Sequence, residues 1–196
     1  MNVIKTLLAG AVFAMTASGA NAAVVYADKV VSASYGTCSA SSKLCTGDDR
    51  KNTNNALGAT DGAFYSLGFG GSLVVGFAKS LFPAGSVSLS EITFNRLVGH
   101  HQEADKVSTL DAMGNLVETL GTLTNSSGNG SLIAKQAFTY IRLDDVTKAV
   151  FPGTTSYDGY DVDSVAIAPV PLPAAGAMLL AGLGGFAALR RRRNSL

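Results

Sequence analysis

Tryptophan is absent from this 196-residue chain, which also holds only two cysteines and two histidines. Two thiols without nearby partner ligands argue against a metal site built on cysteine. The lack of tryptophan removes the aromatic residue most typical of platforms that stack on sugar rings, although Tyr65, Tyr157 and Tyr160 could substitute. Charged residues make up only 15% of the chain. The sequence is therefore informative mainly through its two ends and its pattern of apolar residues.

The last two dozen residues fall into three parts. A segment with two prolines precedes sixteen mostly apolar residues, Ala174 to Leu189, and a cluster of arginines follows them. Proline leaves an extended peptide, the apolar run can partition into a bilayer, and arginines hold its far end on the cytoplasmic side. The run is shorter than the about 17–25 residues of a usual span. The flanking residues are Val170, Pro171, Leu172, Pro173, Arg190, Arg191, Arg192 and Arg193.

This tail resembles the PEP-CTERM sorting domain of Gram-negative bacteria, in the variant that has Leu172 between the prolines. The resemblance implies export, transient anchoring in the inner membrane, and processing by an exosortase-type enzyme. It also implies delivery to the cell surface or to an exopolysaccharide matrix. We expect residues 169–196 to be such a sorting tail with a hydrophobic helix, rather than a plain membrane anchor or a core helix.

The first 22 residues have the three parts of a secretory signal peptide. Lys5 supplies the positive charge, the apolar segment runs from Leu7 to Met15, and Ala20-Asn21-Ala22 matches the small-residue cleavage pattern. We expect a signal-peptide helix and cleavage between Ala22 and Ala23.

Residues 23–168 remain as one exported domain of ordinary size. Of the fifteen basic residues in the chain, five are Lys5 and the terminal arginines, so ten basic residues face all fourteen acidic ones and the domain carries about −4. An acidic domain of this kind argues against a nucleic-acid partner, which would require a basic patch.

Cys38 and Cys45 both lie in the exported domain. An even cysteine count outside the cytoplasm predicts a disulfide between them. The bridge would close a polar loop, and chain-entropy arguments give it about 2–3 kcal/mol.

Apolar residues in the exported domain recur with the period of two that is typical of strands. A phase shift near Ser90 predicts a bulge or bend, and the loop from Asp111 to Asn115 predicts a β-hairpin. Because no apolar stripe of helical period is sustained, we predict an all-β fold, an antiparallel β-sandwich of jelly-roll type. The predicted strands lie in 72–77, 86–98, 106–110, 116–120, 138–143 and 160–168.

Segments 55–77, 141–145 and 157–165 are similar to parts of a domain common among PEP-CTERM surface proteins. That domain in turn resembles the galactose-binding-like or discoidin-like jelly rolls. The resemblance implies a β-sandwich, and many members of such folds bind glycans while others bind lipids or proteins.

Three aspartates near the final predicted strand form a candidate metal site: Asp158, Asp161 and Asp163. Asp161 and Asp163 share the parity of the apolar residues that follow, so we expect both on one face of the strand. Clustered carboxylates suit calcium, which takes six to eight oxygen ligands. In the alternative, Asp158 and Gly159 form a turn and the other aspartates are solvated or paired with Arg142.

Two further polar segments carry weaker signals. Adjacent His100 and His101 would point to opposite faces of an extended chain and so would not chelate one metal. We expect the segment from His100 to Asp105 to be a polar loop between strands. The formal glycosylation sequon Asn125-Ser126-Ser127 is expected to be a turn.

The chain contains no serine elbow, phosphate loop or nucleotide-binding fingerprint. We therefore predict an exported, non-catalytic cell-surface or extracellular-matrix protein without a cofactor, or with calcium. The alternative is a carbohydrate-binding module with a structural calcium site. A glycan hydrolase comes third, and would need paired carboxylates to converge from Glu91, Glu103, Asp105 and Glu118.

Overall fold

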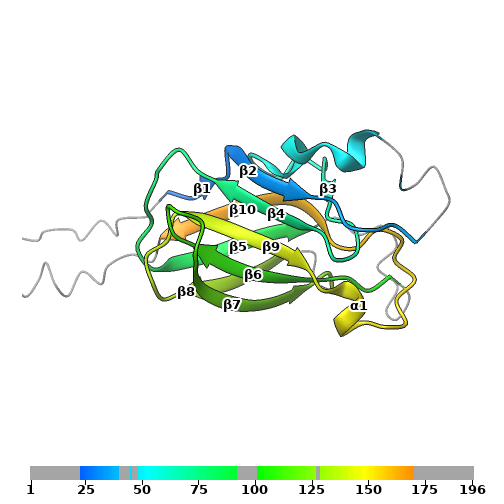
Figure 1. Cartoon of the computed structure of the whole chain (residues 1–196). Coiled ribbons are helices and arrows are strands. Elements are labelled where there is room, and N and C mark those ends of the chain that lie inside the picture. Colours follow the sequence, from blue (N-terminus) through cyan, green and yellow to red (C-terminus); the bar gives the residue numbers. More distant parts are fainter. Residues whose placement is uncertain (1–22, 40–44, 46–47, 92–100, 127–128, 170–196) are drawn as a thin grey trace, which may run out of the picture. The chain divides into compact units, whose positions relative to one another are not determined.

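The computed structural model describes residues 23–39, 45, 48–91, 101–126 and 129–169. These residues form two antiparallel sheets of five strands each (Figure 1). In sheet A the order is β1 (Val25–Tyr26), β10 (Asp161–Pro169), β5 (Gly85–Glu91) and β8 (Asn129–Ala134), and β3 (Tyr65–Ser66) also pairs with β10. In sheet B the order is β2 (Lys29–Ser34), β4 (Ser72–Gly76), β9 (Tyr140–Asp145), β6 (Ala104–Leu110) and β7 (Leu116–Thr124).

The predicted antiparallel β-sandwich of jelly-roll type is confirmed. Regular structure outside the sheets is limited, among the described residues, to η1 (Asp48–Lys51), η2 (Thr53–Ala56) and α1 (Thr147–Val150). None of the helices in the described part of the chain has the length and apolar character needed to cross a membrane. The signal peptide, the sorting tail and their expected helices lie outside the described residues and stay predictions.

The core lies between the two sheets and is aromatic and aliphatic over most of its length. Phe82 packs edge-on against Phe77 with ring centroids 5.2 Å apart, and stacks on Phe138 at 5.7 Å. Each fully buried side chain of this size contributes about 1.5–3 kcal/mol relative to exposure. At one end of the sandwich the buried side chains are instead acidic, namely Glu91, Glu103, Asp158 and Asp161.

The predicted hairpin is confirmed, since β6 and β7 pair antiparallel across the loop from Asp111 to Asn115. The Asp111 carboxylate accepts the backbone N–H groups of Met113 and Asn115, both by way of Oδ1, at 2.8 and 2.9 Å. Gly114 has φ of +85°, a conformation that glycine adopts without strain. The turn chemistry of this loop is local, which is why its sequence predicted it.

Residues 92–98 of the predicted strand 86–98, whose apolar pattern predicted the phase shift near Ser90, lie outside the described residues. Within β5, burial alternates without interruption from Gly85 to Glu91. An irregularity lies on the neighbouring strand, where the register of β10 against β5 shifts between Val162 and Ser164. Asp163 is the extra residue at this β-bulge. A bulge changes which face the following side chains occupy.

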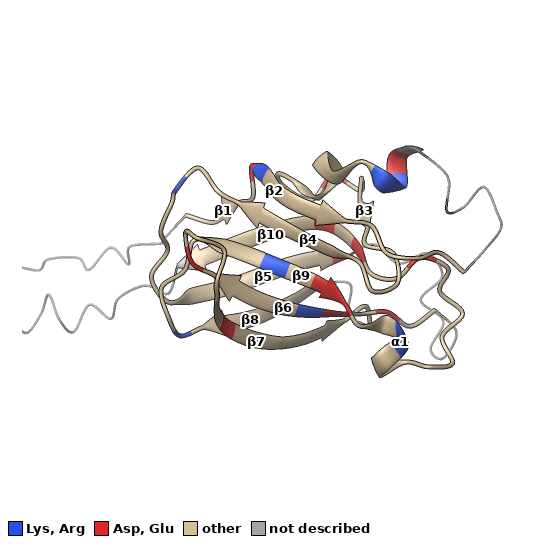
Figure 2. Ribbon diagram, in the orientation of Figure 1, with Lys and Arg blue, Asp and Glu red and all other residues tan. Residues whose placement is uncertain are grey.

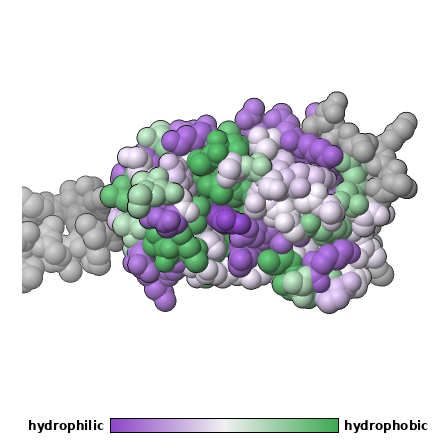
Figure 3. Space-filling view, viewed as in Figure 1, coloured by the Kyte–Doolittle hydropathy of each residue, from purple (hydrophilic) through white to green (hydrophobic). Residues whose placement is uncertain are grey.

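The outer face of sheet B carries charged side chains on β6 and β9 (Figure 2). Asp144 forms ion pairs with Arg142, at 2.8 Å, and with Lys106, at 3.6 Å. Hydrophilic and hydrophobic side chains share this side of the molecule (Figure 3). The alternative in which Arg142 pairs with the aspartates of the last strand is not what the structure shows, because Arg142 pairs with Asp144 on its own strand.

Candidate functional site

Three buried carboxylates meet at the polar end of the sandwich, and we call them the acid cluster: Glu103, Asp158 and Asp161. Each residue offers an oxygen within 4.8 Å of the other two. Glu103 immediately precedes β6, Asp158 lies in the loop before β10, and Asp161 begins β10. Their exposed fractions are 0%, 1% and 2%. Such a cluster, enclosed by protein, needs protons or a cation to offset its charge.

Two of the three aspartates predicted as a metal site, Asp158 and Asp161, belong to the acid cluster. Asp163 does not, because the bulge in β10 separates it from Asp161. Its carboxylate accepts the N–H groups of Asp61, at 3.2 Å, and Gly62, at 3.4 Å. Asp163 therefore anchors a turn, and the third member of the cluster comes from a different part of the chain.

That third member, Glu103, lies in a loop before β6, as expected, but its side chain is fully buried. The amide of Asn125 fixes the segment, since its Oδ1 accepts the Glu103 N–H at 3.0 Å and its Nδ2 donates to the carbonyl of His101 at 2.8 Å. Asn125 is only 5% exposed, so it is a structural turn residue. His100 lies outside the described residues.

Two cationic side chains lie against the acid cluster. Arg50, from η1, donates from Nη1 to Asp158 Oδ2 at 2.6 Å. His101 Nε2 lies 3.0 Å from Glu103 Oε1, which also accepts the hydroxyl of Ser156 at 2.7 Å. The hydrogen bond to Glu103 raises the pKa of His101 above its usual value. Arg50 and His101 thus contact different carboxylates of the acid cluster.

One oxygen of each of the two aspartates is left without a donor among the described residues. Asp158 Oδ1 and Asp161 Oδ1 are buried and have no hydrogen-bond partner among the described residues. Burial raises the pKa of Asp161 well above its usual value, and the charges of Glu103 and Asp158 act in the same direction. Burial, followed by the charges of Asp158 and Asp161, raises the pKa of Tyr35 to about 12. The local field therefore favours a positively charged ligand.

Glu91 extends this acidic region from the end of β5. It is 2% exposed and its side chain hydrogen-bonds to Glu103, whose pKa is raised mainly by burial. Two carboxyl groups can share a hydrogen bond only if one of them carries a proton. The same site could therefore be occupied by protons at low pH and by a cation at higher pH.

The carboxylates considered for a hydrolase do not form a catalytic pair in a cleft. Glu91 and Glu103 come together, but both are enclosed by protein. Asp105 lies within sheet B opposite Asp145, and Glu118 accepts the backbone N–H of Lys135 at the surface. The four residues therefore occupy three separate environments.

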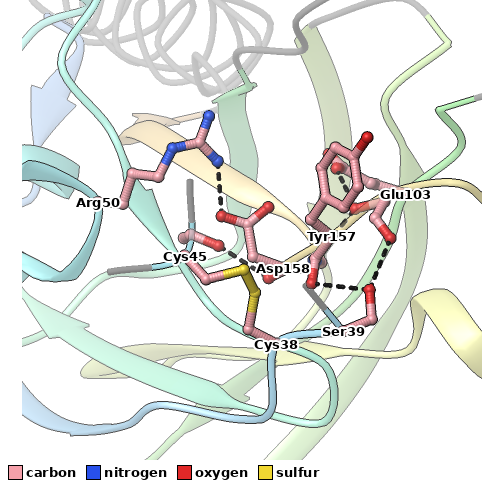
Figure 4. Close-up of a disulfide and its surroundings, with 10 residues drawn as sticks. Cys38, Ser39, Cys45, Arg50, Glu103, Tyr157 and Asp158 are labelled. Atoms are coloured by element: carbon pink, nitrogen blue, oxygen red, sulfur yellow. Dashed lines mark hydrogen bonds and ion pairs between the residues drawn. A yellow bond between two sulfur atoms is a disulfide. The ribbon is translucent and has the colours of Figure 1, made fainter. Parts of the chain in front are cut away.

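The predicted disulfide between Cys38 and Cys45 is confirmed, with the two Cα atoms 6.1 Å apart. The loop it closes is attached to the segment that carries Asp158, because the N–H of Ser39 donates to the carbonyl of Tyr157 at 2.8 Å (Figure 4). Arg50 follows soon after the bridge and reaches Asp158 from the other side (Figure 4). The disulfide thus lies beside the acid cluster.

Of the tyrosines considered as sugar platforms, Tyr65 and Tyr160 are buried in the core, at 2% and 1% exposure. They cannot stack on a ligand. Tyr157 is 43% exposed and packs edge-on against His101 with ring centroids 6.0 Å apart. Sequence reasoning missed Arg50, which is separated from Asp158 by 108 positions and has no local signal that ties it to that residue.

No family model matches the chain, and no curated protein matches it. Among solved structures, the chain is similar to the family 32 carbohydrate-binding module from Streptococcus pneumoniae EndoD, at 11% identity, with a TM-score of 0.47, over 72% of this chain and 95% of that one. It is also similar to a family 35 carbohydrate-binding module from Clostridium thermocellum, at 13% identity and a TM-score of 0.41, over 76% and 100% of the two chains. A Streptococcus pneumoniae fucose binding module is similar at 16% identity and a TM-score of 0.39, over 55% of this chain and 70% of that one.

Proposed function

We propose that this chain is an exported, non-catalytic surface protein whose β-sandwich binds calcium at the acid cluster. The observation that carries the proposal is the pair of buried aspartate oxygens, Asp158 Oδ1 and Asp161 Oδ1, that have no donor while Glu103 lies within reach of both. Calcium takes six to eight oxygen ligands from carboxylates, carbonyls and water. Arg50 contacts Asp158 through Oδ2 rather than Oδ1, and His101 contacts Glu103 through Oε1.

The charge balance supports a divalent ion over a monovalent one. Glu103, Asp158 and Asp161 carry three negative charges when ionised, and Glu91 adds a fourth. Arg50 and a protonated His101 offset two of these charges. One divalent cation would neutralise the remaining two without any shared proton. Without it, the carboxyl groups hold protons instead, which agrees with the raised pKa of Asp161.

Calorimetric titration of the full chain with calcium chloride, together with melting curves in calcium and in chelator, tests this proposal. We expect binding, a higher Tm in calcium, and a gain in unfolding free energy of about 2.7 kcal/mol at a hundredfold excess over Kd. Asp161→Asn should abolish both effects. Asp163→Asn is the matched control, because this residue lies on the same strand but outside the cluster, and it should keep them. Identical melting curves in calcium and in chelator would reject the calcium site.

We also propose that the two ends of the chain direct export and surface attachment, as their sequence patterns predict. Exosortase-type processing after the two prolines would remove residues 174–196. We expect the intact mass of protein extracted from the cell surface to correspond to a chain that starts at Ala23 and lacks the arginine cluster. A surface form that keeps all four arginines would contradict the processing step.

A second candidate function is carbohydrate binding, in which calcium is structural. One observation on this chain favours it: the outer face of sheet A is hollowed, and the hollow is lined by uncharged polar side chains. Glycans present hydroxyl groups and apolar ring faces together, so a site for them needs the same mixture.

A further inference from the structure

The outer face of sheet A contains a hollow of about 390 Å³, apart from the acid cluster. This volume falls within the about 300–1,000 Å³ that is typical of small-molecule sites. Four strands contribute to it, β1, β10, β5 and β8, which are consecutive in sheet A. The hollow is therefore a feature of the sheet itself.

The strand register explains why the sheet is hollow here. Tyr26 is paired with Ala166, Ala166 with Ser88, and Ser88 with Ser131, so the four residues form one row across the sheet. The two central strands carry only small side chains in this row, and the large ring of Tyr26 stands at one edge. Neighbouring strands are about 4.8 Å apart, so the row spans three such gaps. A floor of small residues beside a tyrosine ring makes a groove with one aromatic wall.

The polar groups of the groove are hydroxyls and one amide. They include Ser164, whose hydroxyl lies 3.1 Å from that of Thr60, and Asn129 near the other edge. A hydroxyl has one donor and two acceptor sites and can rotate, so one neighbour does not exhaust it. Among the described residues, none that lines the groove is charged.

This lining discriminates between classes of ligand. A phosphate or carboxylate would lack the arginine or lysine that such groups require. A lipid chain would leave the serine, threonine and asparagine groups without partners, which costs free energy. A neutral sugar satisfies both parts of the lining, because its hydroxyls can pair with the serines and its C–H face can pack on an aromatic ring. Tyr26, 39% exposed, is placed to supply that ring.

We propose that the groove on sheet A binds an uncharged oligosaccharide, with Tyr26 stacking on a sugar ring and Ala166 and Ser88 forming the floor. This inference rests on the carbohydrate-binding function proposed above and names its site. The groove lacks carboxylates, so sugar binding there does not require calcium as a ligand. The aromatic contact comes from a residue at the start of the exported domain rather than from Tyr65, Tyr157 or Tyr160.

An array of neutral oligosaccharides (oligomers of glucose, galactose, mannose and xylose) and of uronic-acid oligomers tests the site, with the full chain as the probe. The strongest neutral binder is then titrated by calorimetry against the variants. We expect Tyr26→Ala to weaken binding on the order of tenfold. Ala166→Leu, which fills the floor, should weaken binding at least as much. Tyr157→Ala is the matched control, because this tyrosine is similarly exposed at 43% but lies outside the groove, and it should bind within twofold of the unaltered chain.

Melting curves of each variant confirm that it is folded, and Tyr26→Phe, which keeps the ring, should retain binding. If a neutral sugar binds but neither Tyr26→Ala nor Ala166→Leu weakens it, the groove is the wrong site while carbohydrate binding stands. If only uronic-acid oligomers bind, the assignment of an uncharged ligand is overturned. If no oligosaccharide binds, both the groove assignment and the carbohydrate-binding function are rejected, and the calcium proposal is unaffected.

Discussion

Asp145 and Asp161 are both buried carboxylates, but the protein surrounds them differently. Asp145 accepts four hydrogen bonds, from the N–H groups of Gly70, Thr147 and Tyr160 and from the Thr147 hydroxyl. Asp161 keeps a buried oxygen without any donor among the described residues. A carboxylate enclosed by its own donors is part of the architecture, whereas one that lacks donors needs a proton or a cation to offset its charge.

The surroundings of Asp145 also show how closely the chain is built around it. Gly159 has φ of +78°, and a Cβ at this position would lie 2.5 Å from Asp145 Oδ2. The backbone therefore comes close enough to the carboxylate only with glycine in that place. Asp158 Oδ1 and Asp161 Oδ1 are also buried, but they have no hydrogen-bond donor in the described part of the chain.

The largest effect is expected at the architectural site. Asp145→Ala removes the acceptor of four hydrogen bonds and leaves buried donors unsatisfied, so we expect a loss of about 3 kcal/mol or more in unfolding free energy. The loss should be equal in calcium and in chelator, because Asp145 is not a member of the acid cluster. Urea unfolding in both conditions measures it. Asp144→Ala, one residue earlier and at the surface, is the control and should cost less than about 1 kcal/mol. A loss that calcium restores would erase the distinction between the two sites.

A smaller effect is expected at Arg50, the cationic side chain that contacts Asp158 in the acid cluster. Arg50→Gln removes the cation that contacts Asp158, so in chelator the charged hydrogen bond is lost at a cost of about 1–2 kcal/mol. In calcium the loss should shrink, and the calcium affinity should rise severalfold, since a competing positive charge has gone. Unfolding curves and calorimetry on the same preparation measure both quantities. Arg142→Gln breaks a surface ion pair on sheet B. It should leave both the calcium affinity and the calcium dependence of stability unchanged. A calcium affinity that falls in Arg50→Gln would show that the guanidinium helps to hold the ion.

The fold was largely predictable from the sequence because its signals are local. Strand alternation depends on neighbouring residues, and the turn at Asp111 is closed by hydrogen bonds across two and four positions. The acid cluster was predictable only in part. Asp158 and Asp161 stand close together in the chain, but Glu103 meets Ser156 across 53 positions and Arg50 meets Asp158 across 108. Such contacts depend on how the strands are ordered, which residue periodicity does not contain.

The sequence predicted neither that Asp163 lies outside the acid cluster nor that Tyr26 lies in the groove, and the two reasons are related. The bulge that separates Asp163 from Asp161 arises in the pairing of β10 with β5, so the parity of the isolated strand placed the two residues on one face. Tyr26 lies on a two-residue strand close to the predicted cleavage site, and its place in the groove follows from its pairing with Ala166. An aromatic residue at the start of a domain becomes informative only when its strand neighbours are known.

The most gradual effect, and the one that separates a carboxylate within the sheet from the acid cluster, is a dependence of stability on pH. Asp105 is fully buried opposite Asp145, and burial raises its pKa well above the usual 3.8. Above that usual value the unfolded chain releases the proton while the folded chain retains it. The unfolding free energy therefore falls as pH rises. For one proton the fall is at most about 1.4 kcal/mol per pH unit. The stabilisation that protonated Asp105 contributes is complete below the pKa of the unfolded chain, and it is lost as pH rises through the pKa of the folded chain. Asp105→Asn cannot ionise, so its stability should match the unaltered chain in acid and exceed it toward neutral pH.

The pKa of Asp161 is raised in the same direction. In chelator, Asp161 should therefore add a second decrease of unfolding free energy as pH rises. Calcium holds that carboxylate ionised, so saturating calcium should remove the part of the slope that belongs to Asp161 and leave the part that belongs to Asp105. Urea unfolding between about pH 4 and pH 7, with and without calcium, separates the two contributions. If Asp105→Asn and the unaltered chain give parallel curves, Asp105 does not hold its proton in the folded state. If calcium leaves every curve unchanged, protons alone neutralise the acid cluster. The acid cluster then resembles the site at Asp145, which needs no ligand from outside.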